Sequence, residues 1–147
     1  MKYIKYFFQF LIIILSFSIF KILGPNISSN LSGKIFELIG PFFRSRKLIY
    51  SNISKAYPGL EEEKLKNITK LMWNNYGRVF SEYMFIKDFR LGKFSGNFEI
   101  EGQEILEDIK KQKKQVIFIS GHIGNFELMA MHIEKSGIDL AAIRSEE

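Results

Sequence analysis

Residues 116–127 constrain the fold more than any other stretch, because an apolar run ends abruptly there in glycine, histidine, glycine and asparagine. Val116 to Ile119 are β-branched or aromatic without interruption, which is typical of a strand buried on both faces of a parallel sheet. From Phe126 onward good helix formers dominate, and Gly137 marks the end of the predicted helix. The stretch therefore predicts an α/β fold in which a strand leads through a short loop into a helix.

His122 lies in the loop of this predicted unit. In open α/β sheets, the loops at the carboxyl ends of the strands carry ligand-binding groups. Gly121 and Gly124 permit a sharp turn, and Asn125 is the expected N-cap of the helix. The turn would bring the imidazole of His122 to the carboxylate of Glu127 in the first helical turn. A histidine bonded to a carboxylate through one ring nitrogen has a fixed tautomer, so its other nitrogen can act as a general base.

The first 23 residues are predicted to form a membrane anchor. Tyr3 to Leu23 is apolar and rich in aromatics, interrupted only by two lysines, a glutamine and two serines. Its length is close to the ~20 residues that a spanning helix needs. A secretory signal peptide and a shallow interfacial helix are the rival interpretations, and the lack of an Ala-x-Ala-like site after Phe20 counts against removal. Lysines on both sides leave the orientation open.

The next segment divides into three parts. Residues 24–33 contain Gly-Pro, several serines and Ser-Gly, and are predicted to be a turn-rich linker. Residues 35–43 form a second apolar patch, which either lies on the bilayer or is a short helix packed on the core. Arg44, Arg46 and Lys47 follow as a basic cluster, read either as a contact for lipid phosphates or as a solvated helix start.

The rest of the chain is predicted to alternate between helices and strands. Residues 48–57 and 60–83 make a helical hairpin around Pro58-Gly59, residues 103–114 make a further helix, and 97–101 and 139–143 make strands. The predicted architecture is α/β: an N-terminal membrane helix, a helical hairpin, then the first part of a mixed or parallel sheet flanked by helices. We expect residues 1–23 to be the anchor and residues 24–147 to be the N-terminal part of a larger catalytic domain.

Composition excludes several classes of site. The chain has 147 residues and no cysteine, so a thiol nucleophile, a disulfide framework and a cysteine metal site are ruled out. His122 and His132 stand without a partner cluster, which does not indicate zinc. The net charge of +5 suits either nucleic acid or an anionic membrane. The apolar N-terminus favours the membrane.

Three blocks in the same order resemble a known family. Gly121 to Glu127, Gly-His-Ile-Gly-Asn-Phe-Glu, is similar to the Gly-His-x-Gly-Asn-Trp/Phe-Glu block of the lipid A biosynthesis acyltransferases, the lauroyl and myristoyl late enzymes. Met72 to Tyr83 resembles the helix before their sheet. Arg46 to Pro58 resembles their juxtamembrane N-x-x-x-A-F-P segment. The resemblance extends from the hydrophobic N-terminus to Ile143.

The resemblance implies a reaction and a location. A fatty acyl group would pass from an acyl carrier protein thioester, with no further cofactor, to the hydroxyl of a 3-hydroxyacyl chain on a lipid A precursor. His122 would be the base and Glu127 its partner, whereas Gly124, Asn125 and Arg144 would bind substrate. The resemblance also implies an enzyme of the bacterial inner membrane whose catalytic domain faces the cytoplasm.

Two alternatives remain open at this point. The first is a non-catalytic membrane remnant of such an enzyme, because the predicted sheet stops at Ile143 and the family continues with further strands and a second basic and acidic site. We accordingly expect little transfer by these 147 residues alone. The second keeps the chemistry but changes the acceptor to a glycerol phosphate or a glycolipid, since those acyltransferases share the His-x4-acid motif.

Overall fold

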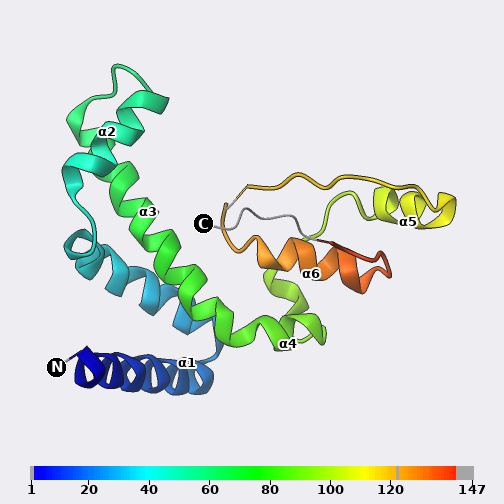
Figure 1. Cartoon of the computed structure of the whole chain (residues 1–147), viewed down its shortest axis with the longest axis horizontal. Helices are drawn as coiled ribbons and strands as arrows, with labels where there is room; N and C mark the ends of the chain where they lie inside the picture. Colours follow the sequence, from blue (N-terminus) through cyan, green and yellow to red (C-terminus); the bar gives the residue numbers. More distant parts are fainter. Residues whose placement is uncertain (1, 122, 142–147) are drawn as a thin grey trace. The chain divides into compact units, whose positions relative to one another are not determined.

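The computed structural model describes residues 2–121 and 123–141. Helices account for all of the regular secondary structure in these residues (Figure 1). The chain divides after Phe85 into two compact parts, Met1–Phe85 and Ile86–Glu147, which we call the N-terminal unit and the C-terminal unit.

The N-terminal unit begins with a long kinked helix, α1 (Lys2–Ile39). At Gly24 the backbone has φ 77° and ψ 168°, a conformation that is essentially restricted to glycine. Pro25 follows and has no N–H to continue the hydrogen-bond pattern. The buried Ser28 hydroxyl donates a 2.9 Å hydrogen bond to the carbonyl of Phe20 across the break. The kink therefore divides α1 into a first arm, residues 2–23, and a second arm, residues 25–39.

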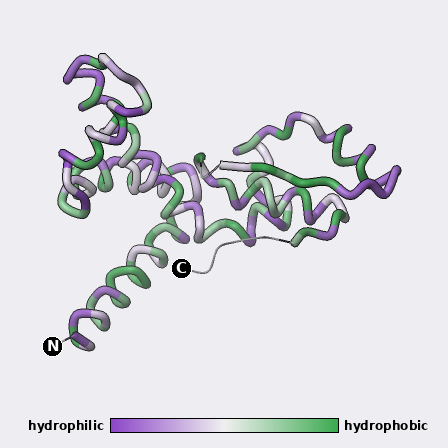
Figure 2. The backbone as a smooth tube through the Cα atoms, turned by 45° about the horizontal axis from the view of Figure 1, so that its top comes forward, coloured by the Kyte–Doolittle hydropathy of each residue, from purple (hydrophilic) through white to green (hydrophobic). Residues whose placement is uncertain are grey.

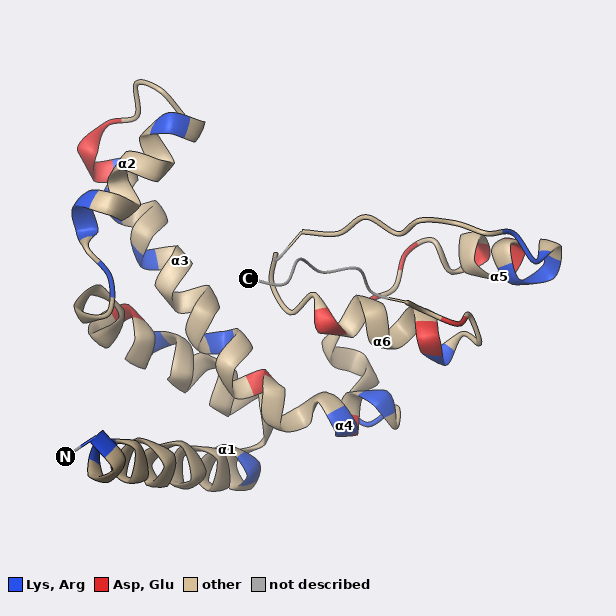
Figure 3. Cartoon of the chain, in the orientation of Figure 1, with Lys and Arg blue, Asp and Glu red and all other residues tan. Residues whose placement is uncertain are grey.

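The first arm is mostly apolar, with hydrophilic residues interspersed, and it is nearly free of charge between its ends (Figures 2 and 3). Most of its large apolar side chains are exposed. The helix is long and apolar enough to cross a membrane, judged by length and composition. The hydroxyls of its two serines are hydrogen-bonded within the helix: Ser16 and Ser18 donate to backbone carbonyls one turn earlier, at 2.7 and 2.9 Å. Lys21 Nζ lies 5.3 Å from the ring centroid of the buried Phe85, a cation–π distance.

The second arm corrects the prediction of a turn-rich linker over residues 24–33. It is helical and packs closely along α3 (Glu62–Glu82). A Cβ added at Gly77 would lie 2.3 Å from the Ser32 carbonyl oxygen, and one at Gly33 would lie 2.9 Å from Asn74 Nδ2. Small residues that let two backbones approach this closely are typical of helix packing in membranes. The serines and glycine read as linker residues are therefore the interface itself.

Polar side chains follow the same interface. Asn74 donates to Glu37, and Arg78 Nε donates to Asn74 Oδ1 at 2.7 Å. Ser29 connects to Glu82 Oε1 at 3.1 Å. Hydrogen bonds between helices of this kind compensate for the few large apolar contacts that small residues can make.

Phe80 of α3 contacts both arms of α1. Its ring centroid lies 5.3 Å from that of Phe17 and 6.2 Å from that of Phe20, both on the first arm. It lies 5.4 Å from the ring of Phe36 on the second arm. These separations fall within the favourable range for aromatic pairs, so one residue joins the two sides of the kink.

The remaining helices of this unit are η1 (Gly40–Phe42), α2 (Arg46–Ala56) and η2 (Tyr83–Phe85). The two helices predicted on either side of Pro58-Gly59 are confirmed as α2 and α3. Helical spacing predicts that one apolar stripe of α3 is buried, formed by Leu65, Ile68, Met72, Tyr76, Val79, Phe80 and Tyr83. The buried face instead consists of Leu65, Thr69, Trp73, Gly77 and Ser81. The predicted face shared only Leu65 with it. The apolar patch at residues 35–43 is partly exposed: Phe42 and Phe43 are 87% and 73% accessible, whereas Phe36 and Ile39 are half-buried.

The C-terminal unit contains α4 (Ile86–Arg90), η3 (Ser95–Asn97), α5 (Gln103–Gln112) and α6 (Glu127–Lys135). Phe89 is buried, and the rings of Phe94 and Phe98 meet it edge-on at 6.1 and 6.0 Å. Helix α4 packs against α6. An ion pair of 2.6 Å between Arg90 and Glu134 joins these two helices at the surface.

The prediction of an α/β fold with a mixed or parallel sheet is wrong for the described residues, which are 74% helical and contain no strand. The expected strands at 97–101 and 116–120, and the described part of the one at 139–143, are irregular. Ile117 and Ile119 are 90% and 92% exposed. An apolar run becomes a strand only when a neighbour completes its hydrogen-bond ladder, and residue pattern alone does not supply that neighbour. The last two residues of the third predicted strand lie outside the described part.

Candidate functional site

The loop predicted to carry the chemistry contains two glycines, Gly121 and Gly124. The N–H of Ile123 donates to the Gly121 carbonyl at 2.8 Å. Gly124 has φ +58°, the left-handed region that glycine enters without a steric cost. The conformational freedom expected of a glycine in this loop is therefore used at Gly124.

Glu127 is the first residue of α6, as predicted, and it is half-buried. A carboxylate in the first helical turn is favoured by the helix dipole. The predicted N-cap at Asn125 is wrong, because Phe126 occupies that position with φ −60° and ψ −20°. The carbonyl of Asn125 instead accepts a 3.1 Å hydrogen bond from the Leu128 N–H. The helix begins one residue later than the asparagine cap requires.

The structure brings Gly124, Asn125 and Glu127 together within this short segment. His122 and Arg144, the predicted base and the predicted substrate arginine, lie outside the described residues. The hydrogen bond expected between His122 and Glu127 therefore stays a prediction. Within residues 2–121 and 123–141, no three His, Asp or Glu side chains gather as metal ligands would.

His132 has a different neighbour. It follows Glu127 by five residues, which places it about 140° around the helix. Its Nε2 lies 2.7 Å from Gln103 Oε1, so it joins α6 to α5. The position of His132 in the middle of the predicted helix indicates a helix-surface or packing residue, and the contact with Gln103 agrees with that prediction.

Part of the lysine run at the end of α5 also has a structural use. Lys110 Nζ donates to the Ser136 carbonyl at 3.1 Å, beyond the last turn of α6. Lys114 pairs with Asp108 at 3.7 Å. A lysine bound to a carbonyl at a helix C-terminus satisfies a group that has no partner within the helix. Acidic residues at the start of residues 103–114 and lysines at its end (Lys110, Lys111, Lys113 and Lys114) predict a solvated helix end rather than a substrate or carrier-protein site, and these contacts agree with that prediction.

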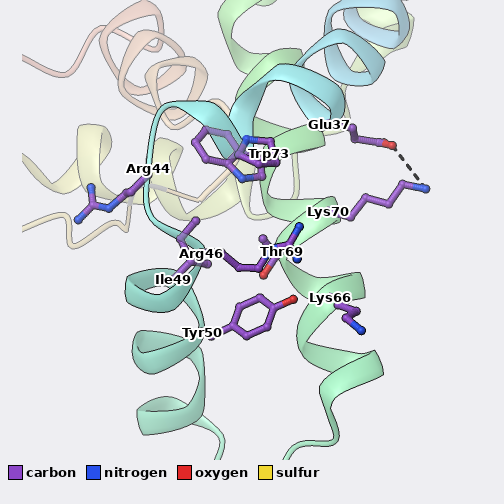
Figure 4. Close-up of a pocket in the computed structure, with 10 residues that line it drawn as sticks. Glu37, Arg44, Arg46, Ile49, Tyr50, Lys66, Thr69, Lys70 and Trp73 are labelled. Atoms are coloured by element: carbon purple, nitrogen blue, oxygen red, sulfur yellow. Dashed lines mark ion pairs between the residues drawn. The ribbon is translucent and has the colours of Figure 1, made fainter.

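A cavity of about 150 Å³ lies in the N-terminal unit between the end of α1, α2 and α3 (Figure 4). We call it the basic pocket, and it is lined by Glu37, Pro41, Arg44, Arg46, Ile49, Tyr50, Lys66, Thr69, Lys70 and Trp73. Sequence reasoning noted the basic cluster but missed its partners on α3. The sequence feature that could have indicated these partners is Trp73, the chain's only tryptophan, which lies one helical turn after Thr69 and Lys70.

A family model described as "Bacterial lipid A biosynthesis acyltransferase" matches residues 1–147. No curated protein and no solved structure matches the chain.

Proposed function

We propose that this chain, which belongs to the bacterial lipid A biosynthesis acyltransferase family, moves a fatty acyl group from an acyl carrier protein thioester to a hydroxyacyl chain of a lipid A precursor. The observation that carries the proposal is the family match over residues 1–147, which includes the Gly121–Glu127 block. Membership implies an acyltransferase of lipid A biosynthesis. The donor and the acceptor hydroxyl belong to the proposal.

In the proposed reaction His122 removes the proton of the acceptor hydroxyl while its oxygen attacks the thioester carbonyl. The new C–O ester bond forms, the C–S bond breaks, and the proton passes from the imidazole to the departing thiolate. Glu127 orients the imidazole and stabilises its charged form. The position of Glu127 in the first turn of α6, beside the Gly121 and Gly124 turns, supports this role.

General-base assistance is worth about 10²- to 10⁴-fold, which leaves much of the barrier to groups that stabilise the oxyanion. The N-terminal end of α6 follows the loop directly and carries partial positive charge from its backbone dipoles. Gly124 and Asn125 occupy this turn, and we assign them to substrate binding together with Arg144.

We further propose that the first arm of α1 anchors the chain in the bacterial inner membrane with the remainder on the cytoplasmic side. The support is the length and apolar composition of the helix. Its 22 residues, Lys2 to Leu23, span about 33 Å at 1.5 Å per residue, comparable with the ~30 Å of a hydrocarbon core.

The two histidines of the chain give a matched test. Membranes containing the chain are assayed with labelled acyl groups on acyl carrier protein and with lipid A precursors of different acceptor chains. His122→Ala should lower turnover by about 10²-fold or more. Glu127→Gln should also lower turnover, and the double variant should lose no more activity than His122→Ala alone. His132→Ala should leave turnover nearly unchanged. Equal loss in both histidine variants contradicts the proposed roles of His122 and Glu127, and no transfer by the unaltered chain from any donor favours the alternative of a non-catalytic membrane remnant.

A further inference from the structure

The basic pocket carries positive charge that the protein does not neutralise. Two of its four basic side chains have acidic partners: Lys66 lies 2.8 Å from Glu62, and Lys70 lies 3.5 Å from Glu37. For Arg44 and Arg46, no ion pair or side-chain hydrogen bond occurs within the part of the chain that the structure describes. A guanidinium offers several N–H donors in a planar fork that suits phosphate oxygens.

Two buried donors lie on the opposite wall of this pocket. Thr69 and Trp73 are each only 8% exposed. The Thr69 hydroxyl and the Trp73 indole nitrogen have no hydrogen-bond partner among the described residues. Buried polar groups are nearly always paired, and leaving one unpaired is costly. Figure 4 shows Arg46 and Tyr50 of α2 facing Thr69 of α3, with Trp73 at one end of the pocket.

The size of the cavity limits what can enter. Its volume of about 150 Å³ is far above the ~10–15 Å³ that one water needs and below the ~300–1,000 Å³ typical of sites for whole ligands. A headgroup fits, whereas an entire lipid does not. Phe42 and Phe43 directly precede Arg44, and their rings are exposed. Exposed rings beside a basic cluster are suited to the boundary between acyl chains and headgroups.

We propose that the basic pocket binds the phosphate headgroup of an anionic membrane lipid. Arg44 and Arg46 bind its charge, and Thr69 and Trp73 donate hydrogen bonds to its oxygens. Glu37 is the one acidic residue of the lining, and it is engaged by Lys70 and by the Asn74 amide. Every lining residue belongs to the N-terminal unit, whereas the Gly121–Glu127 block belongs to the C-terminal unit, so the proposal uses none of the residues assigned to acyl transfer.

Trp73 makes the proposal measurable, since it is the only tryptophan of the chain. The full chain in a neutral detergent is titrated with dihexanoyl phosphatidic acid, with the zwitterionic dihexanoyl phosphatidylcholine and with inorganic phosphate, and the tryptophan emission is recorded. We expect a saturable change with phosphatidic acid and a weaker change with the other two. Arg46→Gln should weaken the binding of phosphatidic acid about tenfold, as the loss of a charge-assisted hydrogen bond implies.

Lys47→Gln is the matched control. It removes the same charge from the neighbouring position of α2, yet Lys47 does not line the pocket. The proposal requires Lys47→Gln to bind phosphatidic acid like the unaltered chain. It is overturned if none of the three compounds changes the emission, or if both variants weaken binding equally. Equal affinity for inorganic phosphate and phosphatidic acid overturns the assignment to a lipid. Acyl-transfer activity enters none of these outcomes.

Discussion

The N-terminal and C-terminal units hold their helices together by different means. In the N-terminal unit, the second arm of α1 meets α3 through glycine and serine, with Ser28, Ser32 and Ser81 almost inaccessible, next to the ring cluster around Phe80, while most large apolar side chains of the first arm are exposed. In the C-terminal unit the buried large apolar side chains among the described residues are Phe89 and Ile133, and a pair of charges, Arg90 and Glu134, bridges the helices at the surface.

This difference corresponds to two modes of helix packing. Water drives large apolar groups inward, and the C-terminal unit follows that rule around Phe89 and Ile133. Lipid gives no such drive between helices, so close backbone packing and interhelical hydrogen bonds take its place in membranes. The α1–α3 interface has both of these features. The two units therefore respond differently to changes in side-chain size, and this is the most direct way to test the comparison.

Removing bulk should damage the C-terminal unit most. Phe89→Ala deletes a buried ring and its edge-on contacts with Phe94 and Phe98. We expect a loss of about 3–5 kcal/mol in the local stability of that unit. Hydrogen exchange of the α6 amides measures it, with the α3 amides as the internal control. Unchanged α6 protection would show that Phe89 is no core residue.

Adding bulk should damage the N-terminal unit. In Gly77→Ala the new methyl group would stand 2.3 Å from the Ser32 carbonyl oxygen, so the helices must separate. We expect a cost of about 1–3 kcal/mol, seen as faster exchange of the α3 amides. Gly96→Ala is the control, because nothing lies within 4 Å of its added Cβ. If Gly77→Ala is as well tolerated as Gly96→Ala, the close packing is refuted.

A single buried hydrogen bond gives a smaller effect. Ser28→Ala removes the donor to the Phe20 carbonyl at the kink and should cost about 1–2 kcal/mol. Ser16→Ala removes a hydroxyl that bonds within an exposed helical turn and should cost less. The unfolding temperatures of both variants are measured in the same detergent. A larger decrease for Ser16→Ala than for Ser28→Ala would contradict the prediction.

The smallest effect is expected at the Glu62–Lys66 pair on the exposed first turn of α3. The hydrogen bond from Lys66, together with its charge, lowers the pKa of Glu62 below the ordinary 4.5. The pair therefore contributes above that ordinary pKa and loses its contribution as the pH falls through the lowered value. Glu62→Gln should change α3 stability at neutral pH hardly at all, since exposed pairs are weak. A loss exceeding that of Gly77→Ala would contradict this.

The helices were predictable from local sequence, whereas their contacts were not. Gly137 correctly marked the end of α6, where it adopts φ +81°, and Pro58-Gly59 correctly separated α2 from α3. Residues 24–33 were misread because serine and glycine are typical of turns but also allow two helices to pack closely together. The strand at residues 116–120 failed because pairing is a property of two segments.

The candidate site was predicted in part. The glycine turns and the position of Glu127 at the start of α6 follow from residue types alone. The predicted N-cap at Asn125 was wrong by one residue, because residue types do not determine the backbone angles at which a helix begins. The basic cluster was noted, but its partners on α3 were missed, since Arg46 and Trp73 are separated in sequence and meet only through the packing of α2 on α3.

The contact of Phe80 with Phe17, Phe20 and Phe36 determines how freely the anchor can be exchanged. A simple tether needs only hydrophobicity and length, so any foreign apolar helix could replace it. The first arm instead presents two rings at a fixed rotation toward α3. A substituted anchor of equal hydropathy would keep its affinity for lipid and lose its rotational alignment, so this segment has to evolve together with α3.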